Sequence, residues 1–180
     1  MRTKAITLYQ PYASLVSIGA KKMETRSWKT NYRGPLAIHA AKSKKYLDLG
    51  WKEPFFTALT SLQKVNEQGR VCLSWWLGYV VAVCELVDCC EVVEESPNYY
   101  HLESGNNPRN YVCLLKRDLL YHKADKEVYF GDYALGRYAW ILENVKPLEK
   151  PVQAKGQQRL WNWELPADGE WIEYWEVTKP

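Results

Sequence analysis

Apolar side chains in the first part of the chain follow two different spacings. Residues 5–9 are rich in β-branched and aromatic side chains with a period of two, which predicts a short strand. Residues 11–18 carry apolar side chains three and four positions apart, which predicts a helix. Pro11 suits the first helical position because proline has no amide hydrogen to leave unpaired. Residues 22–28 and 36–41 return to a period of two and predict two more strands.

The rest of the chain gives clearer signals in some stretches than in others. Residues 43–64 predict two helical segments, one capped by Ser43 and a second opened by Pro54. The second places Phe55, Leu59 and Leu62 on one face, as a helix packed on the sheet requires. Residues 79–87 are almost continuously hydrophobic and predict a buried central strand, and residues 138–145 predict another strand. Residues 94–108 are polar and rich in turn residues, so we expect a loop. The pattern of residues 111–120 fits a helix and a strand equally well.

These elements predict an α+β fold, a small mixed β-barrel with flanking helices. We expect residues 1–180 to form one domain, because the length suits a single compact unit and no linker divides the chain. Residues 162–180 are rich in tryptophan, and we expect this strip to pack on the domain.

The predicted strand over residues 22–28 concentrates polar chemistry. If Met23 faces a core, the two-residue period places Glu24, Arg26 and Trp28 together on the other face, with Lys21 at the mouth of a cleft. The simpler alternative is an exposed strand whose Glu24 and Arg26 pair on the surface, and spacing alone does not decide between the two.

Charge is distributed unevenly along the chain, although the net charge is only +3. Residues 1–45 hold ten Lys or Arg and one acid, a balance of +9, whereas residues 46–180 hold fourteen basic and twenty acidic residues, a balance of −6. Such a basic segment can meet phosphate groups, or it can form a solvated surface that binds nothing. Nine Trp and thirteen Tyr add aromatic rings that can pack in a core or stack on bases.

Cysteine usage and hydropathy bear on compartment and cofactors. The five cysteines are odd in number and form no C-x-x-C pair, so we expect neither a disulfide framework nor a zinc site, and no cofactor is indicated. No apolar run is long enough to span a membrane, and Met1 is followed directly by a predicted strand rather than a signal peptide. We therefore expect a cytoplasmic protein that does not act at a membrane.

Several separated blocks resemble one known family. In chain order they are Gln10-Pro11-Tyr12-Ala13, Gly19-x-Lys21-x-x-Glu24-x-Arg26-x-Trp28, Tyr32-Arg33-Gly34-Pro35-Leu36-Ala37-Ile38-His39-Ala40, Phe130-Gly131-Asp132-Tyr133, Gly136-Arg137-Tyr138-Ala139-Trp140 and Lys155-Gly156-x-Gln158-x-Leu160-Trp161. Together they resemble the ASCH domain, a PUA-like family, with gaps over most of residues 5–163. The resemblance implies a PUA-like barrel that binds RNA, or a modified base, in a cleft beside the first helix.

The resemblance and the residue types together give a set of candidate ligand contacts. They are Gln10, Pro11, Tyr12, Lys21, Glu24, Arg26, Trp28, Arg33 and His39. In such a cleft, cationic side chains neutralise phosphate, a guanidinium binds phosphate or a base edge through two bonds, a carboxylate accepts from an exocyclic amine, and aromatic rings stack on bases. His39 sits among alanines that leave room for a ligand, although a backbone carbonyl can equally satisfy its ring. We expect a monomer whose partner is a nucleotide or a nucleic acid, RNA in preference to DNA.

A catalytic alternative stays open. Some small ASCH-like proteins are amidohydrolases that remove the acetyl group from acetylated cytidine with a lysine, a threonine and a glutamate. Lys21 matches that lysine, but Glu24 stands where the threonine is expected, and no partner acid can be placed. Ribonuclease activity is also associated with the family, so Lys21 and Glu24 would be the acid–base pair if this chain is an enzyme. A pure interaction module is the third possibility.

Overall fold

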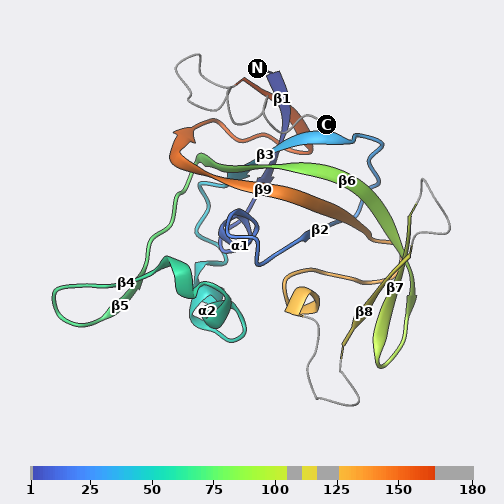
Figure 1. Ribbon diagram of the computed structural model, residues 1–180, viewed down its shortest axis with the longest axis horizontal. Helices are drawn as coiled ribbons and strands as arrows, with labels where there is room; N and C mark the ends of the chain where they lie inside the picture. The colour runs from blue at the N-terminus through green and yellow to red at the C-terminus, as the bar shows by residue number, and fades with distance from the viewer. Residues whose placement is uncertain (1, 105–110, 117–125, 165–180) are drawn as a thin grey trace.

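The computed structural model describes residues 2–104, 111–116 and 126–164 of the chain, and its centre is one strongly curled sheet (Figure 1). Eight strands form this sheet in the path β10-β1-β3-β6-β7-β8, with β9 paired to both β6 and β2. β1 and β3 run parallel, and every other neighbouring pair in this sheet is antiparallel. The strands are β1 (Arg2–Leu8), β2 (Met23–Arg26), β3 (Gly34–Ala40), β6 (Tyr79–Glu95), β7 (Tyr99–Ser104), β8 (Tyr111–Leu115), β9 (Tyr138–Gln153) and β10 (Leu160–Glu164).

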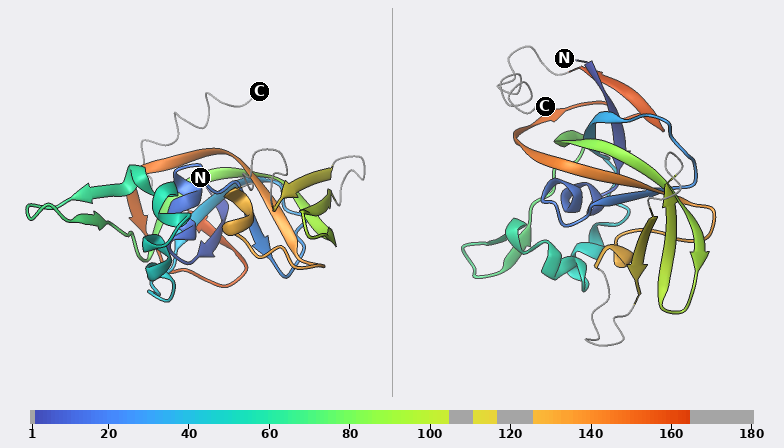
Figure 2. Two further views of the ribbon diagram at one scale, coloured as in Figure 1. Left: turned by 90° about the horizontal axis from the view of Figure 1, so that it is seen from below. Right: turned by 45° about the vertical axis from the view of Figure 1, so that its right-hand side comes forward.

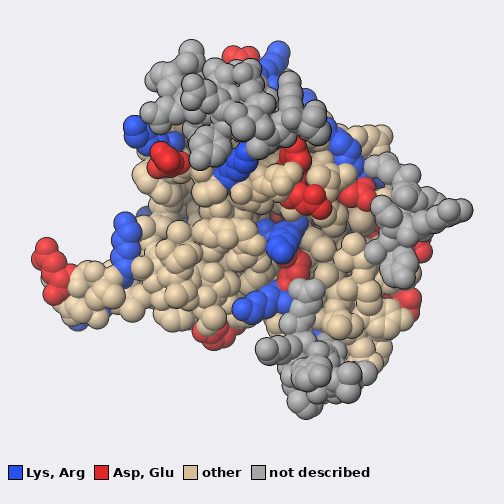
Figure 3. Space-filling view, in the orientation of Figure 1, with Lys and Arg blue, Asp and Glu red and all other residues tan. Residues whose placement is uncertain are grey.

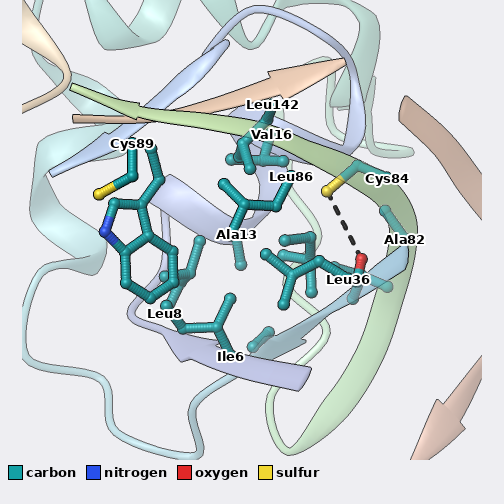
Figure 4. Packing of buried hydrophobic residues seen from close by; sticks show 14 residues of the cluster. Ile6, Leu8, Ala13, Val16, Leu36, Ala82, Cys84, Leu86, Cys89 and Leu142 are labelled. Carbon is teal, nitrogen blue, oxygen red and sulfur yellow. Dashed lines mark hydrogen bonds between the residues drawn. The ribbon is translucent and has the colours of Figure 1, made fainter. Parts of the chain in front are cut away.

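Helix α1 (Tyr12–Ser17) packs against β1, β3, β6 and β9. Its buried side chains Ala13 and Val16 point toward Leu86 and Leu142, and this cluster is the main core (Figure 4). The Cys84 thiol lies in the same core and donates to the carbonyl of Leu36 at 3.5 Å. The helix predicted over residues 11–18 is therefore confirmed, as are the strands predicted near residues 5–9, 22–28 and 36–41.

The helical prediction over residues 43–64 is right only in part: Pro54 does precede a short helix whose Phe55 is buried, but the helical segments are much shorter than expected. The chain forms a 3₁₀ turn (Leu47–Trp51), helix α2 (Phe55–Ala58), a second 3₁₀ turn (Thr60–Leu62) and then the hairpin β4 (Gln63–Val65) and β5 (Val71–Leu73), which extends away from the body of the protein (Figure 2). Gly50 lies within the first 3₁₀ turn and Pro54 is the N-cap of α2. The Asn66 side chain accepts from the amides of Gln68 and Arg70 and closes the hairpin turn. In the described part of the chain the flanking helices are therefore few and short, and the fold is mostly β-sheet.

The loop predicted over residues 94–108 is also wrong in its described part. β6 runs on to Glu95, the Ser96 hydroxyl accepts from the amide of Tyr99 at the turn, and β7 returns antiparallel to β6. The polar residues misled the prediction because only alternate side chains of β7, such as Leu102, are buried. β8 resolves the ambiguity of residues 111–120 in favour of a strand, for the part that is described.

The C-terminal strip is seen only in part. Trp161 and Trp163 are buried where β10 pairs with β1, whereas residues 165–180 lie outside the described part of the chain. The packing of the whole strip over residues 162–180 therefore stays a prediction.

The first prediction concerns the main core. Leu86 is fully buried, so Leu86→Ala removes apolar packing and leaves a cavity in the main core. We expect the free energy of unfolding, measured by urea titration, to fall by about 2–5 kcal/mol. Leu135→Ala is the matched control, since Leu135 is 60% exposed and its loss should change stability little. Equal effects of the two substitutions would contradict this assignment of the core.

Candidate functional site

A buried ammonium group lies where α1, β2 and residues 126–130 meet. Lys21 Nζ donates to the carbonyl of Phe130 at 2.6 Å and to the carbonyl of Met23. It also lies 3.6 Å from Glu24 Oε2 and 3.9 Å from Glu127 Oε1. One amine therefore compensates two carboxylates and two carbonyl dipoles at once.

The position of Lys21 corrects one expectation. Its side chain is 1% exposed, so the prediction that it lies at the mouth of a cleft is wrong. Burial lowers the pKa of Lys21, while Glu24 and Glu127 oppose that shift by favouring the charged form. A group so enclosed can hold its neighbours in place, but it cannot reach a phosphate in solvent.

Residues 126–132 are fixed to β2 by several further contacts. Glu127 accepts from the amides of Lys22 and Met23 at 2.8 and 3.0 Å, and the Thr25 hydroxyl accepts from the amide of Asp132 at 2.9 Å. Gly131 leaves room for this approach, because a Cβ there would lie 2.9 Å from the Thr25 methyl carbon. Gly131 and Asp132 of the motif at residues 130–133 thus have a structural role, because they let this segment pack against β2.

Glu24 and Arg26 pair as their spacing predicts. Arg26 Nε lies 3.0 Å from Glu24 Oε1, and the two side chains are 28% and 12% exposed respectively. Arg26 also donates through Nη2 to the carbonyl of Thr7 at 3.0 Å. The pairing of β1 with β10 ends at Ile6 and Leu160, so Arg26 satisfies the backbone of β1 just beyond the point where β10 turns away.

The parting of β1 and β10 opens a cleft of about 850 Å³. Its lining comes from the ends of β1, β3 and β9 and from the connection between β9 and β10: Thr7, His39, Ala41, Lys42, Gln153, Ala154, Lys155, Gly156, Gln157 and Gln158. Lys42, Lys155 and the three glutamines are exposed. The wall thus combines two cations with several neutral side chains that can donate or accept.

His39 and Gly156 determine how closely the connection approaches the sheet. His39 Nε2 donates to the carbonyl of Ala154 at 3.1 Å, which confirms that a backbone carbonyl satisfies this ring. A Cβ on Gly156 would lie 2.5 Å from His39 Cε1 and 2.9 Å from the Thr7 hydroxyl, so the connection fits here only as glycine. Burial lowers the pKa of His39, opposed by its contacts with the backbone of Ala154 and Gly78, so the ring is neutral at pH 7.

Thr7 contacts both the Glu24–Arg26 ion pair and the cleft. Its carbonyl accepts from Arg26, while its hydroxyl lines the cleft and accepts from the indole of Trp161 at 3.2 Å. On the same side, the Arg159 guanidinium lies 6.0 Å from the ring of Trp28, and Trp28 packs edge-on against Trp140 at 4.6 Å. Trp28, two residues beyond β2, therefore lies near the connection that forms the cleft wall.

The remaining predicted residues have structural contacts. Gln10 is fully buried, where its side chain accepts from the amide of Ser14 and donates to the carbonyl of Trp76. Pro11 is buried at the start of α1, and Tyr12 packs edge-on against Phe55.

Arg33 is likewise held within the protein. It pairs with Asp88 at 2.9 Å and donates to the carbonyls of Thr30 and Tyr32. Burial opposes ionisation of Asp88, but hydrogen bonds from Ser104, the amide of Cys89 and Arg33 outweigh it and lower the pKa of the carboxyl.

Sequence reasoning missed three parts of this region. No sequence signal marks Glu127, which meets Lys21 only through the fold. Thr7 lies in an ordinary strand pattern, and the cleft wall at residues 154–158 was marked only by Lys155, Gly156 and Gln158 in the last motif block. Among the described residues, no group of three or more His, Cys, Asp or Glu side chains is arranged to hold a metal ion.

Comparison with protein families agrees with this arrangement. The model of the ASCH domain matches residues 6–152, which include the end of β1, the buried cluster of Lys21, Glu24 and Glu127, and most of β9. The chain belongs to the ASCH domain family. No curated protein matched this ASCH chain. Within the described residues, no helix has the length and apolar character needed to cross a bilayer.

The second prediction concerns the buried cluster of Lys21, Glu24 and Glu127. Lys21→Met keeps the length of the side chain but leaves the carboxylates of Glu24 and Glu127 without their shared cation. We expect the free energy of unfolding at pH 7 to fall by about 3–5 kcal/mol, measured by urea titration. Lys22→Met is the control, because the side chain of Lys22 is exposed. Unchanged stability of Lys21→Met would show that the cluster does not hold these segments together.

The third prediction concerns pH. The pKa of His39 is lowered from 6.5, so the folded state resists protonation of this ring. The contribution of His39 to stability is therefore complete above pH 6.5 and is lost as the pH falls toward the folded-state pKa. His39→Gln can still donate to Ala154 but does not titrate, so the difference in unfolding free energy between the two proteins should change between pH 8 and pH 5. A constant difference would contradict the lowered pKa.

Proposed function

We propose that this ASCH domain binds RNA, or a modified nucleotide, in the cleft beside Thr7. The observation that carries the proposal is the cleft itself, whose volume of about 850 Å³ lies in the range of ligand sites. Lys42 and Lys155 can neutralise phosphate, and the amides of Gln157 and Gln158 can bond to base edges. Family membership supports the same class of ligand.

The Glu24–Arg26 pair borders this cleft through Thr7, and the proposal keeps both residues as candidate ligand contacts. The pair is only partly exposed, so each charge is already held in place before a ligand arrives. Lys21 enters the proposal in a different role from the one its sequence suggested. In this proposal the buried Lys21 ammonium holds the carboxylate of Glu24 in position and does not itself contact the ligand.

The geometry favours binding over hydrolysis. Glu127 is an acid partner for Lys21 that sequence reasoning could not place, yet its side chain is only 7% exposed and that of Lys21 is 1% exposed. The amine directs two of its protons to backbone carbonyls, which leaves little freedom to act as a base or nucleophile toward a substrate. The threonine of the amidohydrolase pattern is also replaced by Glu24.

The fourth prediction tests the cleft by charge reversal. Lys42→Glu with Lys155→Glu should weaken binding of short single-stranded RNA, measured by fluorescence anisotropy, and should reduce the slope of log affinity against log salt. For a single strand, this slope falls by roughly 0.7 for every phosphate that is no longer neutralised by the protein. Lys64→Glu with Arg70→Glu makes the same change in charge on the projecting hairpin and should have a much smaller effect. Equal weakening in the two double variants, or unchanged binding in the first, would contradict the proposed site.

A further inference from the structure

Four aromatic rings outside the cleft are grouped in pairs and have no role in the proposal above. Tyr9 packs edge-on against Tyr46, and Trp76 packs edge-on against Tyr79, with ring centroids 5.2 Å apart in each pair. Tyr9 is 43% exposed and Trp76 is 50% exposed, although large aromatic side chains usually bury more of their surface. These four residues are called the aromatic strip below.

Backbone contacts place the Trp76–Tyr79 pair at the wall of the cleft. Tyr79 pairs with Ala40 of β3 and with Gln153 of β9, the residues that adjoin His39 and Ala154 in the lining. The amide of Ala154 donates to the carbonyl of Gly78 at 3.0 Å. Lys42 crosses this junction, because a Cβ on Gly78 would lie 2.8 Å from two of its side-chain carbons.

The Tyr9–Tyr46 pair is joined to the same region. The buried side chain of Gln10 donates to the carbonyl of Trp76 at 3.1 Å, so the residue after Tyr9 is bonded directly to the residue that carries the exposed indole. Connection 41–46 follows β3 and connection 74–78 precedes β6 at the same end of the sheet, where Ala40 pairs with Tyr79. In Figure 1 the second of these leads to the β4–β5 hairpin. The segments that carry the strip are therefore bonded to one another and to the wall of the cleft.

The segments that carry most of the aromatic strip and the cleft wall are basic. Segments 40–46, 74–80 and 153–159 contain five basic residues and no acid, and all five are exposed: Lys42, Lys44, Lys45, Lys155 and Arg159. Lys45 Nζ lies 4.8 Å from the centroid of the Tyr46 ring, so a cation and an aromatic face occur together. Exposed rings between cations complement a polymer that alternates bases with phosphates.

We propose that the cleft and the aromatic strip form one track for single-stranded RNA several nucleotides long. One nucleotide occupies the cleft, and neighbouring bases stack on Tyr9 and Trp76 while the lysines contact their phosphates. Only unpaired bases offer a free face to these rings, so a duplex is excluded from the strip. This inference rests on the proposed function, and it adds the class of ligand: a strand rather than a free nucleotide.

The test compares three probes on the full chain: a nucleoside monophosphate, a single-stranded octanucleotide RNA, and that octanucleotide annealed to its complement. We expect the octanucleotide to bind more tightly than either of the others. Trp76→Ala and Tyr9→Ala should each weaken octanucleotide binding on the order of tenfold, and should leave monophosphate binding unchanged. Trp76→Phe keeps a ring and should retain most of the affinity.

Trp51→Ala is the matched control, because Trp51 is 51% exposed but lies outside the strip. Thermal unfolding of each variant separates loss of stacking from loss of fold, and Tyr9→Ala serves if Trp76→Ala unfolds. Equal affinity of the wild type for monophosphate and octanucleotide, or strip variants that match Trp51→Ala, would overturn the track while leaving the cleft in place. Failure of the wild type to bind any of the three probes would overturn the proposed function and the track together.

Discussion

The site depends on the ion pairs and hydrogen bonds that surround the buried ammonium of Lys21. Removing a charge from water costs several kcal/mol unless the protein replaces the lost hydration. Here two carbonyls and the carboxylates of Glu24 and Glu127 replace it, and they come from β2 and from residues 126–130. The same contacts that compensate Lys21 therefore join the end of α1, β2 and a distant segment into one unit.

The cleft follows from a second constraint, the need to satisfy the edge of β1. β10 leaves β1 after Ile6, and the next carbonyl on that strand, Thr7, is taken by Arg26. Because Arg26 is fixed by Glu24, and Glu24 faces Lys21, the buried cluster and the cleft wall are mechanically linked. Gly156 then lets the connection between β9 and β10 close down on His39 without a steric clash.

The charge balance of residues 1–45 overstates the field that a ligand meets. Lys21, Arg26 and Arg33 are neutralised within the protein by ion pairs. On the face in Figure 3, Lys and Arg are interspersed with Asp and Glu rather than gathered in one patch. Lys42 and Lys155 line the cleft, and Lys44, Lys45 and Arg159 lie close to them in sequence, with no acid within residues 42–45 or 155–159. Recognition would therefore depend on local cations and exposed rings more than on overall charge.

The sequence by itself determined the short strands, the first helix, the family and the pairing of Glu24 with Arg26, because each depends on spacing between near neighbours. It could not reveal the burial of Lys21, since an amine is buried only if carboxylates and carbonyls from elsewhere surround it, and Glu127 lies far along the chain. Over residues 43–64 the helical spacing predicted the helix after Pro54 but not how short it is, because the chain turns into the β4–β5 hairpin at Gln63. The position of the cleft was decided by where β1 and β10 part, which only long-range strand pairing fixes.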